Sequence, residues 1–235
     1  MNPANSEAIP REHLRGSSVN ILMPDDARKI LHAVDESLRP FLALWMFAGA
    51  RKEEAARLTW EQVGEGLASG MVNLRADQAK TGQERSLPIT TNLRLWLMRY
   101  RKPSGSVLPP DWQGDTEKRR MRRLDDLARF IKCRTKGAWV PNGPRHSFGT
   151  FHLKLHGDPS ATVKAMGTSL AKLDKYYASR SETVTREAAA DWFAIVPAES
   201  ADIIPMPMPE IPAQSAVAQA AELPFWIQRR QFLVN

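Results

Sequence analysis

Arg145 and His146 stand together in the stretch VPNGPRHSFGT, residues 140–150, directly before an apolar helical pattern. Two interpretations fit this stretch: an ordinary helix start, or part of a site that binds phosphate. An arginine suits the second, because its planar guanidinium can donate two parallel hydrogen bonds to one phosphate group. Asn142 and Pro144, just before the arginine, need an explanation if the stretch is a site.

Other candidate residues lie elsewhere in the chain. Arg51 stands at a predicted helix start, Lys80 lies in a Lys-Thr-Gly turn, and Tyr176 and Tyr177 are two of the three tyrosines. Taken singly, an arginine or a lysine at such a place is usually a solvated surface residue. Neighbouring residues on a helix point about 100° apart, so we expect one of the two tyrosines to be in the core.

The elements that would position these residues can be predicted from sequence periodicity. Helices are indicated from Pro24, from Pro40 and from Arg51. Residues 71–76 and 85–90 alternate in polarity around the turn, which predicts a small hairpin. Further helices are predicted over residues 145–156, 160–166, 170–178 and 185–195. The expected fold class is therefore mainly α with a small antiparallel β-sheet (α+β).

Residues 118–136 form the most basic segment, with nine basic and two acidic residues. An apolar stripe that includes Leu124 and Ile131 predicts one helix with a cationic outer face. That face is either simply solvated or a contact for a phosphate backbone. The candidate DNA-binding residues on it are Lys118, Arg119, Arg120, Arg122 and Arg123.

The bulk composition limits the possible classes of protein. The 235 residues are 43% hydrophobic, enough for a real core, and carry a net charge of +7, which is compatible with a polyanionic partner. One cysteine, Cys133, excludes a disulfide within the chain and fits a reducing compartment. The longest apolar run, residues 41–50, is far shorter than the roughly 20 residues of a membrane span. We therefore expect a soluble, cytoplasmic protein with no membrane partner.

Five blocks of sequence, in a fixed order, point to a family. AGARKEEAARLTWEQV, AKTGQERSLPI, PRHSFGT, MGTSLAKLDKYY and TREAAADWFAI together resemble the tyrosine recombinase, or phage integrase, family over about residues 24–195. The resemblance implies a protein that cuts and joins double-stranded DNA without a metal ion or another cofactor. In that chemistry a tyrosine attacks a phosphodiester to form a 3′-phosphotyrosine, and a free 5′-hydroxyl reverses the step.

The resemblance also implies roles for particular residues. Arg51 and Arg145 match the two arginines that hold the non-bridging oxygens of the transition state. Lys80 matches the lysine that protonates the departing 5′-oxygen. Tyr177 matches the nucleophile better than Tyr176 does, because it lies nine residues beyond the last histidine position of the family.

The sequence departs from the family at two of these polar positions. Asn142 and Thr168 stand where the family has histidines, and His146 matches only the ordinary neighbour of the second arginine. Asparagine can still donate a hydrogen bond to a phosphate oxygen, whereas threonine is shorter than histidine. Three functions remain open: a working recombinase, a recombinase-derived DNA-binding protein that no longer cuts, and a helical module that binds protein partners.

The predicted organisation has four parts. Residues 1–20 are an N-terminal arm or linker, too short for the helical DNA-clamp domain that the family commonly carries. Residues 21–196 are the integrase-like catalytic domain, and residues 197–224 are a Pro-rich linker. Residues 225–235 are an amphipathic tail that could dock on its own domain or mediate self-association. A DNA partner implies a cytoplasmic, nucleoid-associated location.

Overall fold

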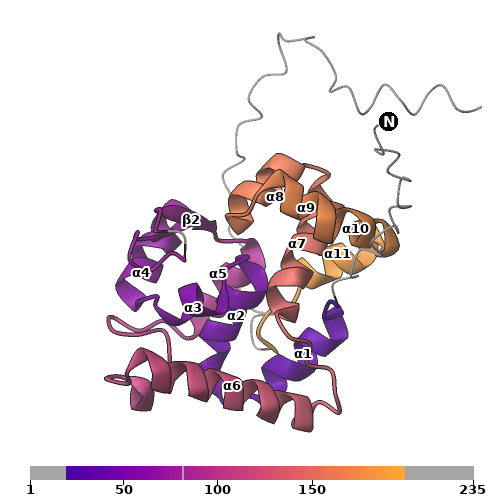
Figure 1. The fold of residues 1–235 in the computed structure, drawn as a ribbon. Coiled ribbons are helices and arrows are strands. Elements are labelled where there is room, and N and C mark those ends of the chain that lie inside the picture. Colours follow the sequence, from indigo (N-terminus) through magenta and orange to yellow (C-terminus); the bar gives the residue numbers. More distant parts are fainter. Residues whose placement is uncertain (1–19, 81, 199–235) are drawn as a thin grey trace, which may run out of the picture. The chain divides into compact units, whose positions relative to one another are not determined.

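The fold is given by a computed structural model, which describes residues 20–80 and 82–198 (Figure 1). The predicted N-terminal arm, Pro-rich linker and C-terminal tail lie almost wholly outside these residues. The elements of the first half are α1 (Pro24–Ala33), α2 (Arg39–Phe47), α3 (Lys52–Ala56), α4 (Trp60–Ser69), β1 (Met71–Leu74), β2 (Arg85–Pro88) and α5 (Thr91–Arg99). Those of the second half are α6 (Glu117–Arg134), α7 (Gly143–His156), α8 (Pro159–Met166), α9 (Leu170–Leu173), a π-helical turn (Asp174–Ala178), α10 (Ser179–Thr183) and α11 (Arg186–Phe193).

Helix α2 is the centre of the core. All of its residues from Pro40 to Phe47 are buried, and it packs against both α5 and α7. Aromatic rings extend this core toward the last helix, because the Trp192 ring of α11 lies 5.5 Å from Phe47 and 5.1 Å from Phe151. The apolar pattern of the sequence therefore places α7, which carries Arg145, firmly against α2.

The predicted hairpin is present as an antiparallel pair. Its register runs from Met71 opposite Pro88 to Leu74 opposite Arg85, and α4 packs on β1. Gly66 permits this close packing, because a Cβ atom there would lie 2.7 Å from Cγ2 of Val72. The register places Arg85 at the first position of β2, beside α8.

The predicted helix over residues 170–178 differs in detail. It consists of α9, the π turn around Tyr177 and α10, and it continues to Thr183. The buried residues Leu173, Tyr177 and Ser181 are spaced by four. An α-helix of 3.6 residues per turn would rotate them progressively off one face, and a wider turn compensates for this drift.

In the described part of the chain, no helix has both the length and the apolar character needed to cross a membrane. Within the same residues, no group of three or more His, Cys, Asp or Glu side chains is placed to hold a metal ion.

Candidate active site

Arg51 is fixed by a carboxylate one turn further along the chain. It precedes the first residue of α3, and its guanidinium donates a hydrogen bond of 2.6 Å to Oε1 of Glu54. Its backbone N–H donates to the other oxygen, Oε2, at 2.9 Å. The side chain of Glu54 is fully buried, so its carboxylate can pair only with groups inside the protein.

A second arginine, Arg85 of β2, shares the same carboxylate by donating from Nη2 to Oε2 of Glu54. Burial alone would raise the pKa of Glu54, but the hydrogen bonds and charge of Arg85, together with Arg51, lower it to about 2. Glu54 is therefore ionised at neutral pH and holds two arginines from different elements in place. Neither Glu54 nor Arg85 is among the site residues predicted from the sequence.

Arg145 lies in the first turn of α7 and donates to two backbone carbonyls. Nη1 bonds to the oxygen of Gly49, and Nη2 bonds to the oxygen of Met166 at 2.7 Å. Position 49 requires glycine, because its φ is +65° and a Cβ atom would lie 2.6 Å from the Phe148 ring. Burial and the charges of Arg51 and Arg85 lower the pKa of Arg145 to about 10, which still leaves it protonated at neutral pH.

The three arginines meet at the C-terminal end of α8. Three consecutive carbonyls, those of residues 165–167, accept hydrogen bonds of 2.7 to 2.9 Å from Arg85, Arg145 and Arg51 in turn. These carbonyls lack partners within the helix and carry its partial negative charge, so cations are favoured there. The end of α8 thus arranges three guanidinium groups in a row.

The ends of α8 are themselves set by local sequence. The side chain of Asp158 accepts hydrogen bonds from the backbone of Ser160 and Ala161, at 2.8 and 3.0 Å, and Pro159 opens the helix. Gly167 ends it with a φ of +58°, and a Cβ atom there would lie 2.7 Å from Cδ of Arg85. Glycine at this position therefore allows both the turn and the close approach of the arginine.

Tyr177 lies beside this cluster with 5% of its surface exposed. Its hydroxyl is 3.0 Å from Nδ1 of His146. Burial raises the pKa of Tyr177, and the charges of Arg145 and Arg51 oppose that rise. Gly149 gives the ring its space on α7, since a Cβ atom there would lie 2.9 Å from Cε1 of Tyr177. Of the two tyrosines, Tyr177 is thus the core residue and also the one beside the arginines.

The two expected histidine positions behave differently. Asn142 directly precedes α7 in a left-handed conformation with a φ of +53°, and it is exposed. Its carbonyl accepts a hydrogen bond from the His146 backbone at 3.0 Å, but its side chain does not cap the helix. Thr168 is partly exposed and directly follows the three carbonyls, with its N–H bonded to the Val163 oxygen at 3.2 Å.

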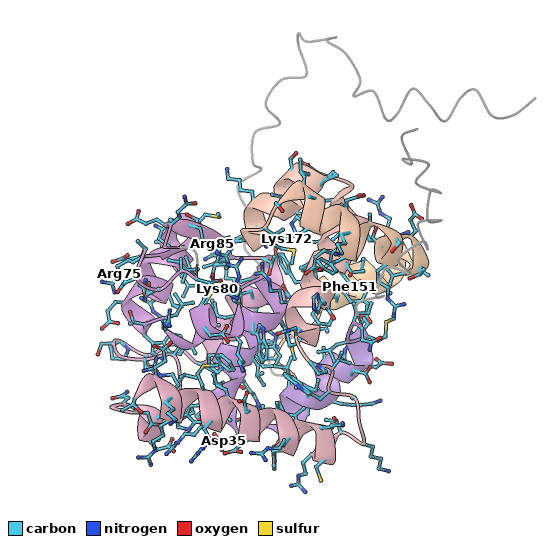
Figure 2. All side chains as sticks on the ribbon, viewed as in Figure 1. Asp35, Arg75, Lys80, Arg85, Phe151 and Lys172 are labelled. Atoms are coloured by element: carbon cyan, nitrogen blue, oxygen red, sulfur yellow. The ribbon has the colours of Figure 1, made fainter. Side chains whose placement is uncertain are left out.

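Two further candidates lie outside the arginine cluster. Lys80 is exposed on the loop before β2, and Figure 2 labels it together with Arg85. Among the described residues, no hydrogen bond or ion pair joins Lys80 to the cluster. Tyr176 is half-buried, with Nζ of Lys175 located 5.3 Å from its ring centroid.

Three of the basic residues of α6 bond to Asp111 or Asp115. Arg119 and Arg123 form ion pairs with Asp115 at 3.0 and 3.1 Å, and Arg123 also bonds to Asp111 at 2.8 Å. Arg120 donates to the carbonyl of Asp115 at 3.3 Å. Lys118 and Arg122 are exposed. In Figure 1 helix α6 runs along the lower edge, well apart from α8 and α9 at the top.

Comparison with known proteins supports the fold. No family model and no curated protein matches the sequence. The crystal structure of XerA recombinase is similar to 76% of this chain, with 18% sequence identity and a TM-score of 0.52. The chain spans 63% of the length of that structure's chain. The predicted fold class, mainly helical with a small antiparallel sheet, is confirmed, and this chain is recombinase-like in fold.

Proposed function

We propose that this protein cleaves and rejoins double-stranded DNA through a covalent bond to Tyr177. The observation that carries the proposal is the convergence of one tyrosine and two arginines from three separate elements. Arg51 and Arg145 both lie close enough to lower the pKa of the Tyr177 phenol against the effect of burial. A phenol of ordinary pKa about 10 needs such cations to act as a nucleophile at neutral pH.

The arginines remain able to bind phosphate in this arrangement. A guanidinium has five N–H donors, and Arg145 uses two of its groups on carbonyls whose positions are fixed by the fold. The other donors can hold the non-bridging oxygens, which gain negative charge as the phenolic oxygen approaches phosphorus. The bond from phosphorus to the 5′-oxygen then breaks, and Lys80, on its exposed loop, supplies the proton. Rejoining is the reverse sequence.

A second candidate function is DNA binding without cleavage. The specific observation that favours it is the absence of histidine at Asn142 and Thr168, combined with the burial of Tyr177, which is 5% exposed. Removing one fixed donor from a site that stabilises an oxyanion costs about 10²–10³ in rate. If neither Asn142 nor Thr168 replaces the hydrogen bond of the histidine expected there, the enzyme is slow unless another side chain supplies it.

One experiment separates the two candidates. The full chain is incubated with a pool of nicked duplexes of randomised sequence, in which cleavage releases a short fragment and traps the protein on the DNA. We expect a covalent complex on a denaturing gel, lost in Tyr177→Phe and kept in the matched control Tyr176→Phe. A salt-sensitive gel shift without a covalent complex would establish the second candidate. No shift at low salt would exclude both.

A further inference from the structure

His146 is the one histidine that contacts the proposed nucleophile among the described residues. Its Nδ1 atom lies 3.0 Å from the Tyr177 hydroxyl, and the two rings are 5.6 Å apart. Asn142 and Thr168, at the positions where the resemblance expects histidines, show no side-chain hydrogen bond to this tyrosine. The proton of the phenol therefore has one nearby side-chain acceptor in the described structure.

We propose that His146 is a catalytic residue, the general base that accepts the phenolic proton of Tyr177 through Nδ1. This inference rests on the proposed function. It gives His146, the residue after Arg145, a role in proton transfer although Asn142 and Thr168 replace the two histidines of the family. As the phenolic oxygen bonds to phosphorus, its O–H bond breaks and an Nδ1–H bond forms. The electron pair of the broken phosphorus–oxygen bond leaves with the 5′-oxygen, which takes its proton from Lys80. In rejoining, the imidazolium returns its proton to the tyrosine.

The direction of the hydrogen bond follows from the two groups. A phenol is a good donor, and a neutral imidazole has one nitrogen that accepts. Burial first, and then the charge of Arg145, lower the pKa of His146, so the ring is neutral near pH 7 and can take a proton. An acceptor at Nδ1 places the ring hydrogen on Nε2, which is a tautomer that nitrogen NMR can identify.

The surrounding charges delay the transfer until DNA is bound. The charged group that acts on His146 is Arg145, and those that act on Tyr177 are Arg145 and Arg51, with Tyr176 also nearby. In the free protein an imidazolium beside Arg145 is unfavourable, and burial holds the proton on the phenol. A bound phosphate adds negative charge to this cluster, which favours the imidazolium. Base catalysis is thereby coupled to the presence of substrate.

The test uses His146→Asn, because the asparagine side chain places a polar atom near the position of Nδ1 but cannot hold a proton. The rate of covalent complex formation with the nicked duplex pool is measured from pH 5 to 9. We expect the wild-type rate to rise with pH through the pKa of His146 and then level off. The variant should be slower by about 10²–10⁴ and should lack that inflection. His156→Asn, an exposed histidine on the same helix, is the matched control.

The outcomes separate this inference from the proposed function. A wild-type protein that forms no Tyr177 complex overturns the proposed function and the base role with it. A wild-type complex together with an unchanged rate or an unchanged pH inflection in His146→Asn overturns the base role alone. If His146→Asn forms no complex at any pH, imidazole added to His146→Ala decides: restored cleavage supports the base, and no restoration overturns it.

A modified substrate separates His146 from Lys80. A bridging sulfur in place of the 5′-oxygen leaves without needing a proton. With that substrate we expect Lys80→Ala to recover its rate and His146→Asn to remain slow, because sulfur replaces only the acid step. Recovery of His146→Asn on the sulfur substrate would assign His146 to the leaving group and overturn its role at Tyr177.

Discussion

Two groups of cationic side chains in this protein are organised in opposite ways. The buried cluster consists of Arg51, Arg85 and Arg145, which come from three elements and share the carbonyls of residues 165–167. The basic face of α6 comes from one continuous stretch, and its Arg119 and Arg123 pair with the largely buried Asp115, while Arg123 also pairs with the exposed Asp111. The carboxylate of Glu54, which fixes two of these arginines, is fully buried, whereas the pair between Arg123 and the exposed Asp111 competes with solvent.

Charge density along a sequence is therefore a weak guide to where charge acts in the folded protein. The α6 stretch is the most basic segment of the sequence, but two aspartates that precede it neutralise part of that face. The buried cluster draws on single arginines that look ordinary in the sequence. Their effect comes from low solvent exposure, which strengthens electrostatic interactions, and from the helix end that fixes them.

The largest expected effect is on stability, through the carboxylate of the buried cluster. Glu54→Gln leaves Arg51 and Arg85 without their shared counter-charge inside the protein. We expect the free energy of unfolding to fall by about 3–5 kcal/mol, because removing one partner of a buried pair leaves an uncompensated charge. Urea denaturation measures this change.

The control for Glu54 comes from α6. Asp111→Asn breaks an exposed pair with Arg123, so we expect a loss of about 0–1 kcal/mol. Equal losses in the two variants would mean that the buried cluster and the surface pairs are not energetically distinct, and the contrast between them would fail.

The next effect concerns the forked shape of the guanidinium. Arg145→Lys keeps a positive charge but cannot bind the Gly49 and Met166 carbonyls and a phosphate together. We expect the rate of covalent complex formation to fall by about 10²–10³. Arg123→Lys on α6 should leave that rate unchanged. A similar fall in both variants would point to a general loss of DNA binding, which a gel shift would reveal.

Acid should weaken the buried cluster selectively. The pKa of Glu54 is about 2 in the folded protein, below its ordinary value of 4.5, so its contribution to stability is present above about pH 4.5 and is lost as pH falls toward 2. The difference in unfolding free energy between wild type and Glu54→Gln should therefore shrink over that range. A constant difference from pH 6 to 3 would show that Glu54 acts through packing and not through its charge.

The sequence predicts the fold well where periodicity is strong. The hairpin and the helix that carries Arg145 lie where their patterns place them. The resemblance also names Arg51, Arg145 and Tyr177, which the structure brings together.

Other parts of the site could not be predicted because they depend on tertiary contacts. Glu53 and Glu54 are alike in the sequence, and only the packing of α3 buries the second. The one sequence feature that points to a contact between Arg51 and Glu54 is their spacing of three residues, since residues three apart share a helix face. From the sequence, His146 is only the residue next to Arg145. In the structure, the π turn places the Tyr177 hydroxyl next to its Nδ1 atom.

The smallest expected effect tests whether the basic face of α6 contacts DNA at all. Lys118 and Arg122 are exposed and lie four residues apart, on one side of the helix. If they contact phosphates, Lys118→Gln and Arg122→Gln should each reduce the slope of log affinity against log salt by about 1. Arg186→Gln removes the same charge from the exposed start of α11 and should leave the slope unchanged. Because all three variants change the net charge equally, identical slopes would assign the basic residues of α6 to solubility and leave DNA binding to the arginine cluster.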